Sequence, residues 1–104
     1  MARAVGAADR ELYAGLIRLH ILHHAAEGPI FGLSIIEELA THGYRLSPGT
    51  LYPILHAMQR KGWLRARVER AGRHSRKVYE ITRRGNTAFQ EARGKVKELF
   101  GELF

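Results

Sequence analysis

A chain of 104 residues has room for one domain with one modest hydrophobic core, and 45% apolar and 26% charged residues are typical of a globular protein. It contains no cysteine, which excludes disulfides and thiolate metal sites, and no stretch approaches the roughly 18 apolar residues of a membrane-spanning helix. Because a signal-peptide apolar region is also missing, we expect a cytoplasmic protein with no membrane partner.

The net charge of +7 is concentrated in the middle of the chain. Residues 45–84 hold eleven Lys and Arg against two acidic residues, residues 1–44 hold three against five, and residues 85–104 hold three against three. This segregation is typical of a surface that binds a polyanion such as nucleic acid. The alternative interpretation is an ordinary solvated surface.

The first predicted helix follows residues 1–8, which we expect to be flexible. Asp9 is the expected N-cap, its carboxylate accepting from first-turn amides, and the helix runs to about Ala26, before Gly28-Pro29. Its apolar arc holds Leu12, Tyr13, Leu16, Ile17, Leu19, His20, His23 and His24. Ile21 and Leu22 lie outside that arc, so the apolar surface exceeds what one small domain covers, and we expect part of it to contact another chain.

Two further helices are predicted. The second runs from about Gly32 to His42, with Gly43 suited to the left-handed position that follows; its apolar residues are Leu33, Ile36, Leu39 and Ala40. The third has Ser47 as its N-cap and Pro48 in its first turn, and it ends at Gly62. Its expected buried stripe is Leu51, Ile54, Leu55 and Met58. Pro53 predicts a local irregularity that the helix survives.

A β-hairpin and a last helix complete the chain. The strand-like stretches are residues 63–70 and 77–82, and they flank the polar turn AGRHSR, residues 71–76. Thr82 then caps a helix to the C-terminus. Its apolar residues follow a heptad spacing that predicts a partner helix: Phe89, Ala92, Val96, Leu99 and Leu103, with Phe100 and Phe104 alongside.

This order of elements is that of a winged helix-turn-helix with an added dimerisation helix, a mostly α fold with a small β-hairpin. The third helix is the one expected in a DNA major groove, because its N-terminus offers hydroxyls, free N–H groups and close backbone approach to phosphate. Tyr52 is expected to reach outward; the alternative is a core aromatic. The predicted DNA-binding residues are Arg45, Ser47, Pro48, Gly49, Thr50, Tyr52, Pro53, Arg60, Lys61, Arg70, Arg73, His74, Arg76 and Lys77.

Two stretches carry a family resemblance: LHILHHAAEGPIFGLSIIEELATHGYRLSPGTLYPILHAMQRKGWL and RKVYEITRRGNTAF. With the pattern S-x-G-T-L-Y-P-x-L and a strand ending in Thr-x-x-Gly, the chain resembles the PadR family of bacterial transcriptional regulators over roughly residues 12–90. The resemblance implies a homodimeric repressor of a symmetric double-stranded operator, with residues 9–81 binding DNA and residues 82–104 dimerising. The single terminal helix is similar to that of compact members.

The resemblance also implies release from DNA by a small aromatic or hydrophobic effector. Similar compact members hold flat ligands with a tryptophan between the terminal helices, whereas here the only tryptophan is Trp63, at the start of the hairpin. The rings that could stack on a ligand in place of that tryptophan are Phe89, Phe100 and Phe104. The alternative is a hydrophobic dimer interface with no pocket. The predicted effector or dimer-interface residues are Leu12, Leu16, Ile17, Phe89, Val96, Leu99, Phe100 and Leu103.

The six histidines raise a metal hypothesis. His20 and His24 are spaced i, i+4, which suits Zn²⁺ with Glu27 or another residue as third ligand. The alternatives are partly buried histidines at an interface and a pH-dependent interface. Metal or drug sensing is therefore a second functional hypothesis, and RNA binding is a third that charge alone permits.

Enzymatic chemistry is not predicted. The only aspartate is Asp9, Glu37 and Glu38 are adjacent rather than paired across a cleft, and no phosphate-binding glycine loop or serine nucleophile with a base is recognisable. No cofactor is predicted.

Overall fold

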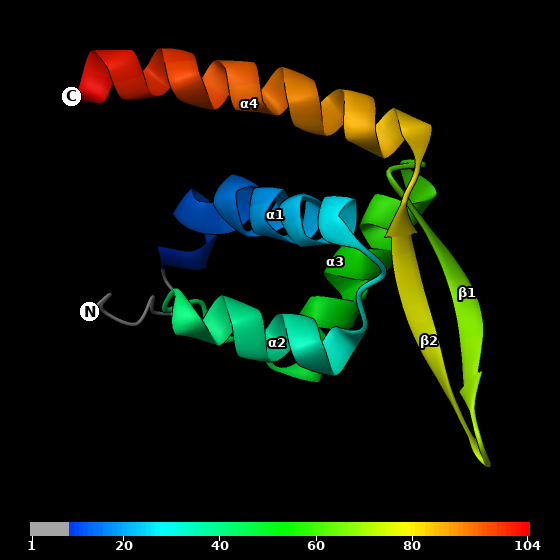
Figure 1. Ribbon diagram of the computed structural model, residues 1–104. Coiled ribbons are helices and arrows are strands. Elements are labelled where there is room, and N and C mark those ends of the chain that lie inside the picture. The colour runs from blue at the N-terminus through cyan, green and yellow to red at the C-terminus, as the bar shows by residue number, and fades with distance from the viewer. Residues whose placement is uncertain (1–8) are drawn as a thin grey trace.

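The computed structural model describes residues 9–104, and the flexibility expected of residues 1–8 lies outside them. Within this range, four helices and one two-stranded hairpin follow in the order α1 (Arg10–Glu27), α2 (Gly32–Thr41), α3 (Pro48–Arg60), β1 (Leu64–Ala71), β2 (His74–Ile81) and α4 (Arg83–Leu103) (Figure 1). This mostly helical architecture with a small hairpin confirms the predicted fold class.

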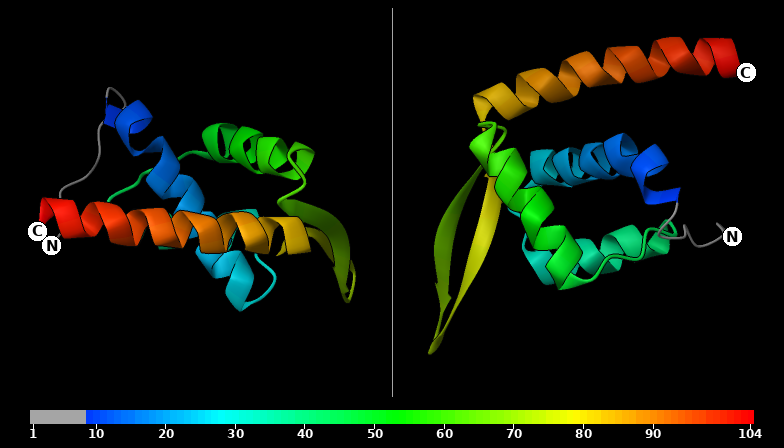
Figure 2. Two further views of the ribbon diagram at one scale, coloured as in Figure 1. Left: turned by 90° about the horizontal axis from the view of Figure 1, so that it is seen from above. Right: turned by 180° about the vertical axis from the view of Figure 1, so that it is seen from behind.

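Helices α1 to α3 form one body, from which the hairpin projects as a wing (Figure 1). Helix α4 leaves the base of the wing and runs back over α1, crossing it obliquely when seen from above (Figure 2). None of the helices within residues 9–104 is long and apolar enough to cross a membrane.

The core of α1 differs from the predicted apolar arc. Ile21 and Leu22, expected outside the arc, are buried, whereas Leu12 and Leu16 are 77% and 44% exposed. The reason is that α1 contacts α2, β2 and α4, which lie on different sides of it, so one arc cannot describe its burial. Exposed apolar surface is present on this helix, but at Leu12 and Leu16 rather than as an excess caused by Ile21 and Leu22.

Helix α2 buries Ile35 and Leu39, at i and i+4, and leaves Leu33 62% exposed. Leu33 shares the predicted apolar spacing with Leu39 but is not part of the core, because packing against α1 and α3 selects the Ile35 side of a short helix with several apolar residues. Gly43 follows the helix with φ +87°, as predicted.

Helix α3 is continuous through Pro53, and no irregularity interrupts it. Proline 53 lies in the second turn, where the amide that it lacks would have reached back only to Gly49. Leu51, Leu55 and Met58 are buried as predicted, and Ile54 is half-buried.

The N-caps of α1 and α3 differ from expectation in one respect. Asp9 and Ser47 hold the N-cap positions, but neither side chain caps the helix amides. Asp9 has helical backbone angles, unlike the extended N-cap in which a side chain reaches the first turn. Ser47 instead directs its hydroxyl to the Thr50 hydroxyl, 3.3 Å away.

The wing has a shorter turn than predicted. The strands are paired from Leu64↔Ile81 to Ala71↔His74, so Gly72 and Arg73 alone form the turn, with Gly72 at φ +63°. Residues 74–76, expected in the turn, belong to β2 because cross-strand pairs hold them. Near the wing's base, Tyr79 also forms a bridge with Ile30, which fixes the hairpin to the segment before α2.

The junction of the wing and α4 is closely packed. The Thr82 hydroxyl accepts from the Gly85 N–H at 2.9 Å, which confirms the predicted cap, and it donates to the Gly62 carbonyl. Gly85 lies against the Trp63 carbonyl so closely that an added Cβ would overlap it.

Candidate nucleic-acid interface

One face of α3 is free of the protein core. The view from behind shows α3 in front of the other helices and beside the wing (Figure 2). The exposed residues recur every three or four positions: Pro48, Gly49, Tyr52, Pro53, His56, Gln59 and Arg60. His56 and Gln59 were not among the predicted DNA-binding residues, although their spacing from Tyr52 places them on the same face.

The start of α3 is open to a ligand. Thr50 and Leu51 donate to the Ser47 carbonyl, while Ser47, Pro48 and Gly49 are exposed. A Cβ added at Gly49 would meet only the Ser47 Oγ, at 3.8 Å, so internal packing does not require this glycine. A helix N-terminus with exposed N–H groups and hydroxyls is suited to binding phosphate.

Tyr52 combines the two roles considered from the sequence. Its side chain is 37% exposed, and the hydroxyl end of its ring lies against Gly32, the first residue of α2, where an added Cβ would overlap it. Tyr52 therefore packs α3 onto α2 and still contributes to the outer face.

The carboxylates of the wing pair with some of its cations and leave others free. The hairpin holds six basic and two acidic residues. Glu80 accepts from Arg67 at 2.8 Å and also lies near Arg65, and Glu69 pairs with Arg76 at 2.9 Å. Across the described part of the chain, no ion pair involves the exposed cations Arg70, Arg73 and Lys77.

The Arg76 side chain is exposed, but contacts within the protein hold it in place. Its Cζ lies 4.0 Å from the centroid of the Phe31 ring, and two of its nitrogens donate to Glu69. The hydrogen bond from Arg76 lowers the pKa of the Glu69 carboxyl, so this pair stays charged near neutral pH. Arg76 thereby joins both strands of the wing to the segment before α2.

The remaining predicted residues flank this surface. Arg45 precedes α3, Arg60 is its last residue and Lys61 follows it; all three are exposed. Lys61 lies over Trp63, with its Nζ 5.6 Å from the ring centroid. His74 is exposed in the first position of β2, beside the turn.

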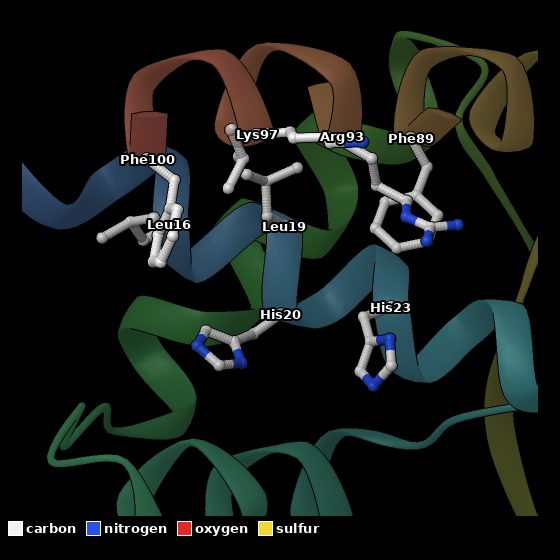
Figure 3. Close-up of a pocket in the computed structure, with 9 residues that line it drawn as sticks. Leu16, Leu19, His20, His23, Phe89, Arg93, Lys97 and Phe100 are labelled. Atoms are coloured by element: carbon white, nitrogen blue, oxygen red, sulfur yellow. The ribbon is translucent and has the colours of Figure 1, made fainter. Parts of the chain in front are cut away.

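A second surface lies between α1 and α4. It is an apolar cleft of about 520 Å³ whose lining includes Leu16, Leu19, Phe89, Val96 and Phe100, with Arg93 and Lys97 at its α4 side. In Figure 3, Phe100 points from α4 toward Leu16, whereas His20 points away from α4. Of the predicted interface residues, Ile17 belongs to the chain's own core, and Phe89 is almost buried while it lines the cleft.

Further apolar side chains continue this surface to the end of α4. Leu99, Phe100, Leu103 and Phe104 are 53% to 89% exposed, and Leu12 of α1 is 77% exposed. Contiguous exposed apolar residues of this kind are typical of protein contact surfaces.

The two candidate metal ligands have different surroundings. His20 stacks on His42 with ring centroids 4.5 Å apart, and burial, followed by the neighbouring His42, lowers its pKa. His24 instead lies close to Glu27 and Glu38.

Residues 21–91, which include α2, α3 and the whole wing, match the transcriptional regulator PadR-like family. The chain belongs to this family. The transcriptional regulator Rv3488 of Mycobacterium tuberculosis is 43% identical over 94 residues, which cover 90% of this chain and 88% of that protein.

Solved PadR structures share the architecture. A PadR family transcriptional regulator from Eggerthella lenta is 27% identical with a TM-score of 0.77, covering 89% of this chain and 82% of that one. A PadR-like regulator from Bacillus cereus shows the same fold at 24% identity and a TM-score of 0.73, with 89% and 95% covered. The relatives are transcriptional regulators, and this chain is accordingly a PadR-family regulator and not an enzyme.

Proposed function

We propose that this PadR-family regulator is a homodimeric repressor that acts in the cytoplasm on a two-fold symmetric operator. Residues 9–81 bind DNA: α3 enters the major groove, and the wing follows the neighbouring phosphates. The observation that carries this proposal is the exposed face of α3 with its open N-terminus, beside a wing whose Arg70, Arg73 and Lys77 are unpaired among the described residues.

The division of labour within this surface follows from its chemistry. Gly49 and the Ser47 hydroxyl are placed to contact phosphate at the start of α3, whereas His56 and Gln59 have the side-chain donors and acceptors that read base edges. Arg70, Arg73 and Lys77 supply charge to the backbone and strengthen binding at low salt.

Residues 82–104 are proposed to dimerise the chain. The exposed Val96, Leu99 and Leu103 recur on one side of α4, which is the heptad spacing of a helix that packs on another helix. Together with Leu12 and Leu16 of α1, these residues form an exposed apolar surface. Monomeric proteins rarely leave such a surface in contact with water.

Release from DNA is proposed to follow binding of a small hydrophobic or aromatic effector in the α1–α4 cleft. Phe89 and Phe100 supply ring surfaces, and Arg93 and Lys97 supply positive charge beside them (Figure 3). An effector there changes the contact of α4 with α1, and hence the angle between two DNA-binding units. The competing hypothesis is that the cleft is filled by the partner's apolar side chains.

The DNA proposal is tested by selecting bound sequences from a randomised double-stranded pool at moderate salt. We expect a palindrome with half-sites about one helical turn apart. A folded protein that recovers no motif, or that prefers single-stranded RNA, would contradict the proposal and favour the RNA-binding hypothesis.

The effector hypothesis needs a separate measurement on the same operator. A panel of aromatic compounds is titrated against the protein–DNA complex, with Phe100→Ala as the variant that opens the cleft. We expect to find a compound that releases the wild-type protein from DNA but does not release Phe100→Ala. If no compound binds either protein, the result favours the competing hypothesis that the partner's apolar side chains fill the cleft.

A further inference from the structure

Three ligating groups meet in the last turn of α1. Atoms of His23, His24 and Glu27 that can bind a metal all lie within 4.8 Å of one another. The Glu27 Oε1 is 3.3 Å from His24 Nδ1 and 3.8 Å from His23 Nε2. In a tetrahedral site with bonds of about 2.0 to 2.2 Å, ligand atoms are about 3.4 Å apart, so a small movement brings this set to a common ion.

His24 is oriented as a metal ligand is. Its Nδ1 faces Glu27, while its Nε2 lies 3.4 Å from Glu38 Oε1 on α2. Histidines that bind a metal through one nitrogen characteristically donate the other N–H to a carboxylate, which fixes the ring and raises its basicity. Glu38 is held in turn by His42, 3.5 Å away.

The burial of the three groups suits a site that closes around an ion. The His24 side chain is 23% exposed and lies between carboxylates of two helices, whereas the His23 and Glu27 side chains are 55% and 64% exposed. A cavity of about 320 Å³ lies beside His24, Glu27 and Glu38, and it leaves room for a water or another ligand as fourth donor. The negative end of the α1 dipole also favours a cation here.

We propose that His23, His24 and Glu27 bind one divalent transition-metal ion of the Zn²⁺ class, with Glu38 as the positioning residue for His24. Two imidazoles and one carboxylate are a borderline donor set, which suits Zn²⁺, Co²⁺ or Ni²⁺ better than Ca²⁺ or Mg²⁺. His20 is outside this set, because it stacks on His42.

The ion would join α1 to α2 through the His24–Glu38 contact. Ion binding to the folded chain then stabilises it, because an ion that binds the folded state more tightly than the unfolded state raises the melting temperature. The site is independent of the proposed repressor function, because ion binding is measured without DNA.

The test uses the full, untagged chain, stripped of metal with a chelator that is then removed. Calorimetric titration with Zn²⁺ gives the affinity and stoichiometry, and the visible absorption of bound Co²⁺ reports a low-coordinate site with nitrogen and oxygen ligands. We expect one ion per chain, at least a tenfold loss of affinity in His24→Ala and in His23→Ala, and roughly a tenfold loss in Glu38→Gln.

The matched control is His20→Gln, which removes another α1 histidine one turn from His24. It should bind Zn²⁺ with the wild-type affinity and give the same Co²⁺ spectrum. The proposal is overturned if wild type shows no saturable binding at one ion per chain, if His23→Ala binds like wild type, or if His20→Gln loses binding equally. Because His23 is largely exposed, its variant should fold even if His24→Ala does not.

Discussion

Gly49 and Gly85 occupy the first turns of α3 and α4, but packing requires only one of them. An added Cβ meets nothing closer than 3.8 Å at Gly49, whereas at Gly85 it overlaps the Trp63 carbonyl. Backbone atoms cannot turn aside as a flexible side chain does, so the two glycines should respond oppositely to the same substitution.

Gly49→Ala should fold normally and bind DNA less tightly. Alanine has a higher helix propensity than glycine, so stability is unchanged or higher, while the new methyl group holds a phosphate away from the α3 amides. We expect a loss of about tenfold in operator affinity, or ~1.4 kcal/mol. Fluorescence anisotropy with the selected operator and urea unfolding measure the two effects, and unchanged affinity would show that nothing approaches Gly49.

Gly85→Ala should destabilise the fold by about 1 to 3 kcal/mol, because the methyl group displaces the backbone at the junction of wing and α4. Gly94→Ala is the control on the same helix, since its Cβ would meet nothing within 4 Å, and it should be stabilising by about 0.5 to 1 kcal/mol. Urea unfolding at one fixed protein concentration compares them. Equal stability of the two variants would contradict the close packing at Trp63.

Some cations of the wing form ion pairs within the protein, and others are available to bind phosphate. Arg67 is paired with Glu80, but Arg73 occupies the turn with no ion pair among the described residues. Arg73→Ala should therefore lower the salt dependence of operator binding by about one phosphate contact per protomer, and Arg67→Ala should lower it less. Affinities measured over a series of salt concentrations give the slopes; equal slopes for both variants would argue against this division.

The contact between α1 and the end of α2 should be sensitive to pH. Burial and the neighbouring His42, His24 and His23 lower the pKa of His20, against the opposing effect of Glu38. The unfolded chain then binds a proton more readily than the folded chain, so the stability present above pH about 6.5 decreases as the pH falls through that value. Unfolding of the metal-free protein between pH 7.5 and 5 measures this loss, and His20→Gln should show a smaller one.

Elements with strong local signals were predictable from the sequence. Pro48, Gly62 and Thr82 identified the ends of α3 and the start of α4, because these residues favour their positions through their own backbone or side-chain chemistry. Burial on α1 and α2 was not predictable, since Leu33 and Ile35 are equally apolar and only the neighbouring helices decide which of them is buried. The cluster of His24 with Glu38 was also invisible, because it joins two helices.

At the scale of the whole molecule, the chain has a basic side and an apolar side. The α3 face and the wing belong to the first, and the exposed apolar residues of α1 and α4 belong to the second. The basic surface was predictable because its charged residues lie close together in sequence, whereas the cleft between α1 and α4 depends on how two distant helices cross.

Leu99→Glu should convert the proposed dimer to a monomer, because it places a charge within the proposed contact of two α4 helices. Leu33→Glu is the control, since Leu33 is similarly exposed but lies on α2. Sedimentation at micromolar concentration should find a dimer for wild type and Leu33→Glu and a monomer for Leu99→Glu. A monomeric wild type would contradict the homodimer proposal outright.

The tight joint at Thr82 and Gly85 makes α4 a lever. Its 21 residues extend about 30 Å, so a rotation of ~10° about the joint moves the free end by ~5 Å. The Thr82 hydroxyl donates to the carbonyl of Gly62, two residues after the end of α3. This bond couples the start of α4 to the end of α3, so the two helices move together. In the proposed dimer, the tilt of α4 would therefore set the distance between the two α3 helices, and relatives with similar α3 residues would differ in operator spacing through α4 alone.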